Sequence, residues 1–241
     1  EFLELPITEP SPKVFNLCLP ASHCTQCDTN IKSYQNIPVL SYLFLKGKCA
    51  NCKTKISIRY PFVEALTGIA SAVVAFQLGG GIETLLALFL TWTLIALSGI
   101  DIDHQLLPDN ITLPVLWLGI LLSLFGIFTD PVSSIIGAMA GYLSLWSIYQ
   151  LFKLLTGKEG MGFGDFKLLA LFGAWFGWQY LMIIVLISSL VGAIIGISMM
   201  IILGRDKNIP IPFGPYLAIA GWIALLWGET INTVYLTSIG L

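Results

Sequence analysis

The chain has 241 residues, of which 56% are apolar and only 11% are charged. Soluble domains contain roughly 25% charged residues, so this composition excludes a water-soluble globule and predicts a surface that largely faces lipid. The net charge of −2 is unevenly distributed, because residues 13–59 contain seven Lys or Arg and one Asp, a local charge of +6.

Residues 1–60 hold most of the polar sequence, and their prolines indicate turns and extended segments. This part is predicted to be a small module outside the membrane. Four of its cysteines form two closely spaced pairs, whose spacing is typical of a four-thiolate zinc site of the ribbon type. Two disulfides are the alternative, and they require an oxidising compartment. The paired residues are Cys24, Cys27, Cys49 and Cys52, and the fifth cysteine, Cys18, is left over.

From residue 61 onward the sequence is a series of apolar runs separated by short polar or Gly/Pro breaks, and a membrane span needs about 20 such residues. The fifth run is short, which indicates a helix that begins inside the protein. We therefore predict an all-α polytopic membrane protein with about seven transmembrane helices, in which residues 1–60 form the cysteine module and 61–241 the transmembrane domain. The runs are 61–79, 84–103, 111–128, 132–155, 165–178, 181–203 and 212–231.

The distribution of Lys and Arg predicts the orientation of these spans. When seven spans are threaded through a membrane, all 12 Lys and Arg residues fall on the side of the cysteine module. The positive-inside rule places that side in the cytosol. Because the cytosol is reducing, this orientation favours zinc over disulfides for the four paired cysteines.

Ionisable residues cluster at two breaks that approach the same membrane face. The first break contains Asp101, Asp103 and Asp109, and the second is a glycine-rich segment that ends at Asp165. A carboxylate from each break would supply the base and the acid of a two-aspartate hydrolase. Two alternatives remain at this point: the aspartates cap helices, or they serve a proton-coupled membrane transporter.

The runs from Asp101 to Pro114 and from Lys158 to Leu169, together with the paired cysteines and the segment Arg59–Glu64, resemble the bacterial type IV prepilin peptidases. These enzymes are membrane aspartyl proteases of the GxGD class. The resemblance covers essentially the whole chain. It implies an inner-membrane endopeptidase that removes the leader of prepilins and pseudopilins on the cytosolic side. It also implies that the enzyme methylates the new N-terminus with S-adenosylmethionine.

Carried over by position, the resemblance places the catalytic aspartates at Asp101 and Asp165 and the structural zinc on the four paired cysteines. Gly162, Gly164 and Glu64 are expected near the substrate, while no residue is assigned to S-adenosylmethionine. The expected partners are the protein substrates and membrane lipid, with no nucleic acid. Family members begin with a further span and a basic stretch, which the first six residues do not match, so we expect an eighth span and leave the methyltransferase activity of this chain open.

Two other aspartates are predicted not to be catalytic. On a helix, Asp103 lies about 200° round from Asp101, so the two cannot face the same substrate carbonyl. Asp109 follows a proline and precedes an apolar run, which predicts that it caps the next helix. Lys167, two residues after Asp165, is expected to point away from it and to act as an interface anchor.

Overall fold

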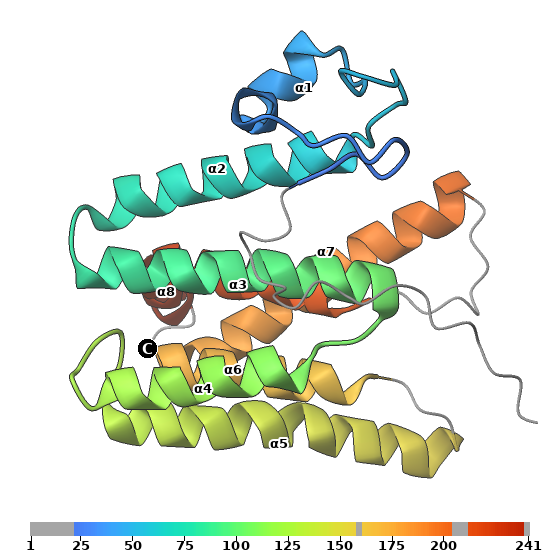
Figure 1. Cartoon of the computed structure of the whole chain (residues 1–241). Helices are drawn as coiled ribbons and strands as arrows, with labels where there is room; N and C mark the ends of the chain where they lie inside the picture. Colours follow the sequence, from blue (N-terminus) through green and yellow to red (C-terminus); the bar gives the residue numbers. More distant parts are fainter. Residues whose placement is uncertain (1–21, 158–160, 204–211, 239–241) are drawn as a thin grey trace, which may run out of the picture. The chain divides into compact units, whose positions relative to one another are not determined.

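A computed structural model describes residues 22–157, 161–203 and 212–238 as helices joined by turns, together with two isolated β-bridges (Figure 1). The chain divides into two compact units, Glu1–Ile69 and Ala70–Leu241. Helix α2 (Arg59–Leu78) contains the point of division. Cys18 lies outside the described residues.

The first unit contains the cysteine turns, a short 3-10 helix (Ser33–Asn36), helix α1 (Leu40–Phe44) and the beginning of α2. Each cysteine pair lies in a turn closed by one β-bridge, His23 with Asn30 and Lys48 with Lys55. Glu64 of α2 accepts a hydrogen bond from the backbone N–H of Val39 at 2.8 Å. Because Val39 precedes α1, this bond connects α1 to α2 within the unit.

The predicted apolar runs all form helices. After α2 come α3 (Ile82–His104), α4 (Asp109–Ser123), α5 (Pro131–Thr156), α6 (Phe163–Phe176), α7 (Leu181–Leu203) and α8 (Gly214–Ser238), with a 3-10 turn (Trp178–Tyr180) before α7. In the described part of the chain, five of these helices are long and apolar enough to cross a membrane. Helices α4 and α6 are shorter, with 15 and 14 residues.

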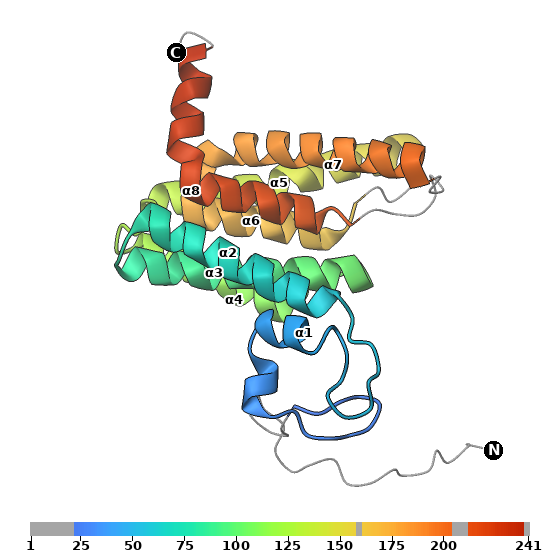
Figure 2. The ribbon, with the colours of Figure 1, turned by 90° about the horizontal axis from the view of Figure 1, so that it is seen from above.

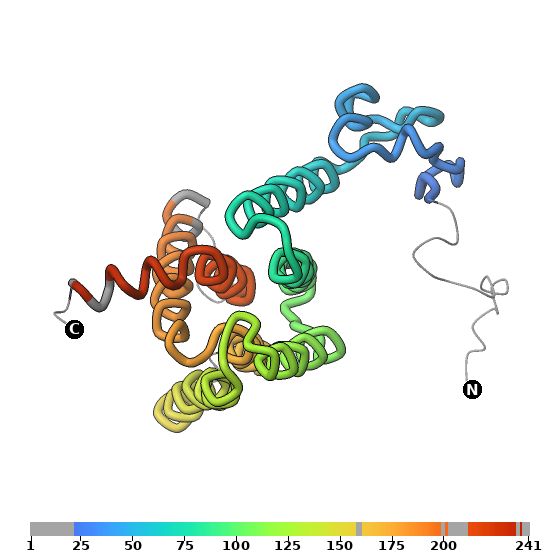
Figure 3. The backbone as a smooth tube through the Cα atoms, turned by 90° about the vertical axis from the view of Figure 1, so that its left-hand side faces the viewer, coloured from blue at the N-terminus to red at the C-terminus, as the bar shows by residue number. Residues whose placement is uncertain are grey.

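Helix α6 forms the centre of the second unit. Figure 3 shows it surrounded by α4, α5, α7 and α8, and Figure 2 shows the first half of α8 running beside it. From Asp165 to Phe176 every residue except Lys167 is buried. This burial agrees with the expectation that the short fifth run lies inside the protein, because a helix covered by other helices need not match the thickness of the bilayer.

Glycines let α5 approach α6 closely. A Cβ at Gly141 would lie 2.7 Å from the carbonyl oxygen of Leu169, and one at Gly173 would collide with the backbone of Gly137. Small residues at such crossings allow backbone-to-backbone packing in membrane proteins. Ser134 adds a hydrogen bond from its hydroxyl to the carbonyl of Ala174, at 2.7 Å. This packing fixes α6, and with it the first turn that contains Asp165.

Candidate active site

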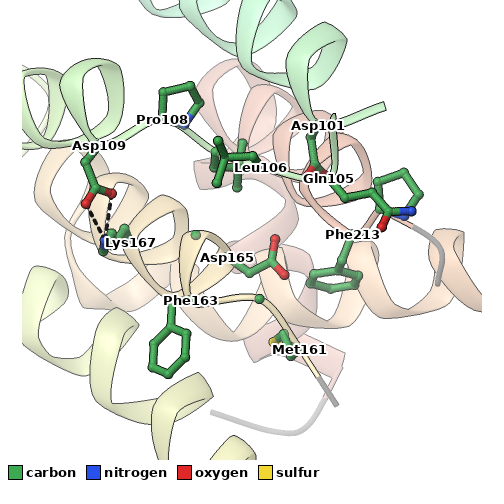
Figure 4. A pocket seen from close by; sticks show the side chains of 14 residues that line it. Asp101, Gln105, Leu106, Pro108, Asp109, Met161, Phe163, Asp165, Lys167 and Phe213 are labelled. Carbon is green, nitrogen blue, oxygen red and sulfur yellow. Dashed lines mark hydrogen bonds and ion pairs between the residues drawn. The ribbon is translucent and has the colours of Figure 1, made fainter. Parts of the chain in front are cut away.

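Asp101 and Asp165 come from different helices and line the same pocket. Asp101 lies one turn before the C-terminal end of α3, and Asp165 lies in the first turn of α6. Both are buried, at 6% and 7% exposure. The pocket has a volume of about 850 Å³ and is lined by residues 101 and 105–109, 161–165 and 167, and 212–213. Figure 4 shows both carboxylates directed into this space.

Asp101 and Asp165 present their carboxylates to the same pocket from two different helices. When two such acids act on one substrate, one of them is protonated and the other is ionised. Such a pair contains a base and an acid at the same time. The geometry therefore provides the groups that general acid–base hydrolysis requires.

Gly214, which the sequence analysis did not single out, contacts Asp101 directly. Its backbone N–H, at the first residue of α8, donates to Oδ2 of Asp101 at 3.0 Å. The N-terminus of a helix favours negative charge, so this contact stabilises the ionised form of Asp101. A Cβ at Gly214 would lie 2.6 Å from the same oxygen, and glycine is therefore the residue that fits. The signal in the sequence is the Pro/Gly-rich start of the last apolar run, residues 212–215.

The glycines before Asp165 have two different roles. Gly164 packs against Leu107, since a Cβ at Gly164 would lie 2.7 Å from Cβ of Leu107. Gly162, at the N-cap of α6, faces open space, and a Cβ there would meet only a carboxylate oxygen of Asp165, at 3.9 Å. Both glycines line the pocket, whereas Gly160 lies outside the described residues.

Asp109 does not cap α4, so that prediction is wrong. The N-cap is Pro108, and Asp109 is the first residue of the helix. Its two carboxylate oxygens instead accept from Nζ of Lys167, at 2.6 and 2.7 Å (Figure 4). Lys167 lines the pocket and pairs with Asp109, so its side chain does not point away from the site as predicted. Its expected role as an interface anchor stays a prediction. Hydropathy along the chain cannot reveal a pair formed between residues 58 positions apart.

Asp103 is exposed, while Asp101 is buried. The two aspartates therefore lie on different faces of α3, as the helical spacing predicts. Glu64 belongs to the first unit, where it binds the backbone of Val39. Its expected place near the substrate stays a prediction.

The four paired cysteines form one cluster. Their sulfur atoms all lie within 4.8 Å of one another, and the four side chains are free thiols. The sulfurs of Cys24 and Cys52 are 3.8 Å apart. Tetrahedral zinc with Zn–S bonds of about 2.3 Å requires sulfur atoms about 3.8 Å apart, so the cluster fits this metal.

The two cysteine turns repeat the same pattern, Cys-x-x-Cys-x-Thr, which the sequence analysis did not use. In each turn, the N–H of the first cysteine donates to the carbonyl of the threonine, at 3.0 Å for Cys24 and 2.8 Å for Cys49. The hydroxyls of Thr29 and Thr54 lie 3.4 and 3.3 Å from the sulfurs of Cys27 and Cys52. Hydrogen bonding by Thr29 lowers the pKa of the Cys27 thiol to about 6. A thiol that ionises readily is a better metal ligand.

These observations define a class of protein: a helical membrane protein with two buried aspartates at one pocket and a four-thiol site. Comparison with known proteins identifies the family. The Type IV leader peptidase family matches residues 88–197, and the Bacterial Peptidase A24 N-terminal domain matches residues 2–78. The chain belongs to the type IV leader peptidase family.

Its relatives include proteins named prepilin leader peptidase/N-methyltransferase. The protein from Stutzerimonas stutzeri is 55% identical over 98% of this chain and 81% of its own length. The protein from Aeromonas hydrophila is 57% identical over 93% of this chain and 77% of its own length. The protein from Neisseria gonorrhoeae is 48% identical over 96% of this chain and 79% of its own length. No solved structure matches the chain.

Proposed function

We propose that this protein cleaves the leader peptide of type IV prepilins and type II secretion pseudopilins at the cytosolic face of the inner membrane, and then methylates the new N-terminus. The observation that carries the proposal is the pair of buried aspartates at one pocket, in a chain 55% identical to a prepilin leader peptidase/N-methyltransferase. Family membership supports the peptidase class, and the carboxylate pair supports an aspartyl mechanism.

In this proposal Asp101 and Asp165 are the catalytic residues and have different roles. Asp101 accepts the N–H of Gly214 at the N-terminus of α8, which favours its carboxylate form. It therefore acts as the base that removes a proton from the attacking water. Asp165 holds the proton and donates it to the leaving amide nitrogen. Gly162 and Gly164 leave the pocket wall without side chains, so that an extended substrate segment can approach Asp165.

The four-cysteine cluster is proposed to bind one structural zinc ion. All four thiolates would serve as ligands, which leaves no open position for a substrate and makes the site structural rather than catalytic. The support is the mutual distance of the sulfur atoms and the hydrogen bonds that the thiols of Cys27 and Cys52 donate to the hydroxyls of Thr29 and Thr54. When bound, the metal would crosslink the two turns of a module that has few buried side chains of its own.

The methyltransferase activity is proposed because relatives of the chain are named prepilin leader peptidase/N-methyltransferase. S-adenosylmethionine is the expected methyl donor, and we assign no residue to it. The distribution of Lys and Arg supports an orientation in which the cysteine module, residues 1–60, lies in the cytosol. Residues 61–241 are proposed to form the membrane-embedded peptidase domain.

The test is incubation of the purified protein with a prepilin, followed by mass spectrometry. We expect a product that lacks the leader and, when S-adenosylmethionine is added, a further mass increase of one methyl group. A prepilin that stays at full length would contradict the peptidase proposal. A cleaved product that gains no methyl group would contradict only the second activity.

A further inference from the structure

The segment between α3 and α4, residues 105–108, contacts the first turns of both α6 and α8. Gln105 adopts a left-handed conformation, with φ 53°, and its N–H donates to the carbonyl of Asp101 at 2.9 Å. Leu107 is buried and lies between two glycines: Cβ atoms at Gly164 and Gly214 would come within 2.7 and 3.3 Å of it. This linker is therefore in contact with the starts of α6 and α8.

The ion pair between Asp109 and Lys167 is a second connection at the same place. Asp109 begins α4 directly after the linker, and Lys167 follows Asp165 by two residues on α6. Nζ of Lys167 lies within 2.7 Å of both oxygens of Asp109, and the two side chains are 24% and 56% exposed. The pair thus joins the segment that follows Asp101 to the turn that contains Asp165, and both of its members line the pocket.

A partly exposed ion pair of this kind contributes little to global stability, so its value for folding is small. The position of the ion pair, beside both aspartates, instead makes it relevant to the geometry of the catalytic groups. Two catalytic groups must be held in a reactive geometry, and a displacement of about 1 Å can reduce the rate about 100-fold. Any change in the distance between the α3–α4 linker and α6 alters the separation of the two carboxyl groups.

We propose that Asp109 and Lys167 are positioning residues that fix the distance between Asp101 and Asp165. This inference rests on the proposed peptidase function. Neither residue exchanges a proton with the substrate. Together with the packing of Leu107 against Gly164, the ion pair holds the linker against the first turn of α6.

The experiment measures prepilin cleavage by Asp109→Asn, Lys167→Gln, the double variant that combines both, and the charge-swapped variant Asp109→Lys with Lys167→Asp. In each single variant kcat should fall about 10- to 100-fold, while KM stays within about threefold of the wild-type value. The loss of kcat in the double variant should equal that in either single variant, because each single change already removes the ion pair. The charge-swapped variant should have a kcat at least about tenfold above that of the single variants. Lys167→Arg should keep most of the wild-type kcat.

Glu83→Gln is the matched control. It removes an exposed carboxylate from the first turn of α3, at the end of the helix far from Asp101, and should leave kcat unchanged. Single variants with wild-type kcat, or a charge-swapped variant no more active than the single ones, would overturn the positioning role. A loss of kcat that follows a fall in melting temperature and is not restored by Lys167→Arg would also overturn it. If the wild-type protein cleaves no prepilin, the proposed function fails rather than this inference.

Discussion

The cysteine cluster and the aspartate pocket are built in opposite ways. The cysteine cluster combines two short turns, each closed within eight residues by its own backbone hydrogen bonds and β-bridge, and its side chains are exposed or half-buried. The aspartate pocket combines the ends of three helices, with a hydrogen bond between residues 113 positions apart, and its two carboxylates are buried. The cysteine cluster would depend on the proposed zinc ion for its cohesion, whereas the aspartate pocket depends on helix packing.

This difference predicts that the two sites fail independently. A metal-dependent turn has little other stabilisation, so loss of a ligand should loosen it first. The aspartate pocket is held by the core around α6, whose buried residues lie within the second unit. Changes at the pocket should therefore affect catalysis while the cysteine module stays intact. Loss of the metal should loosen the cysteine module while the helices around the pocket keep their structure.

The largest effect is expected from Asp101→Asn and Asp165→Asn. Asparagine keeps the shape of the side chain but cannot act as a base or an acid, so each variant should lose prepilin cleavage completely. Zinc content and membrane insertion should equal those of the wild-type protein, and mass spectrometry of the prepilin measures the loss.

The matched control for this pair is Asp103→Asn, since Asp103 is exposed on a different face of α3. Measurable cleavage by this variant is expected. Normal cleavage by Asp101→Asn together with an inactive Asp103→Asn would show that the pair is misassigned. Cleavage by all three variants would contradict the aspartyl mechanism.

The second largest effect is expected from Gly214→Ala. The new Cβ would lie 2.6 Å from Oδ2 of Asp101, so either the carboxylate or the start of α8 must move. A shift of about 1 Å at a catalytic group predicts a loss of kcat of about 100-fold. Gly68→Ala is the control, because a Cβ at Gly68 meets no atom within 4 Å. Equal kcat for the two variants would show that the contact between Gly214 and Asp101 has no role in catalysis.

A structural rather than catalytic effect is expected from Cys24→Ser and Cys49→Ser. Each removes one thiolate from the cluster, so zinc content should fall below one ion per chain. Hydrogen exchange should become faster at residues 22–30 and 48–55 and stay unchanged in α6, because the two regions have separate sources of stability. Metal analysis and exchange measured by mass spectrometry test both statements. Wild-type protein, prepared without oxidation, that contains no zinc would contradict the metal assignment.

The elements that could be predicted from the sequence are those whose signal is local. Seven apolar runs predicted seven helices, because hydropathy is a property of neighbouring residues. Each close cysteine pair is also a local signal, and the metal chemistry of such pairs predicted that the two would lie together. The contact of Gly214 with Asp101 and the pair of Asp109 with Lys167 could not be predicted, because each depends on how distant helix ends meet. Thr29 and Thr54 were visible in principle, since the repeat of Cys-x-x-Cys-x-Thr is in the sequence.

The smallest effect is expected from Thr29→Val, which tests how the cysteine turns tune their ligands. Hydrogen bonding by Thr29 lowers the pKa of Cys27 to about 6, so loss of the hydroxyl should raise that pKa toward its ordinary value. Zinc binds the thiolate and competes with protons, so the affinity for zinc falls as pH falls through the thiol pKa. The variant should therefore release zinc at a higher pH than the wild-type protein, and its affinity near neutral pH should be about tenfold weaker.

Titration of zinc against a chelator over about three pH units around the Cys27 pKa of about 6 measures this shift. Thr25→Val, which removes an exposed hydroxyl from the same cysteine turn, is the control and should leave the release curve unchanged. A Thr29→Val curve that coincides with the wild-type one would show that the sulfur-to-hydroxyl contact does not tune the metal site. In that case the two threonines would act only through their carbonyl oxygens, which accept the backbone N–H groups of Cys24 and Cys49. The repeated threonine would then shape each turn without changing the acidity of the thiols.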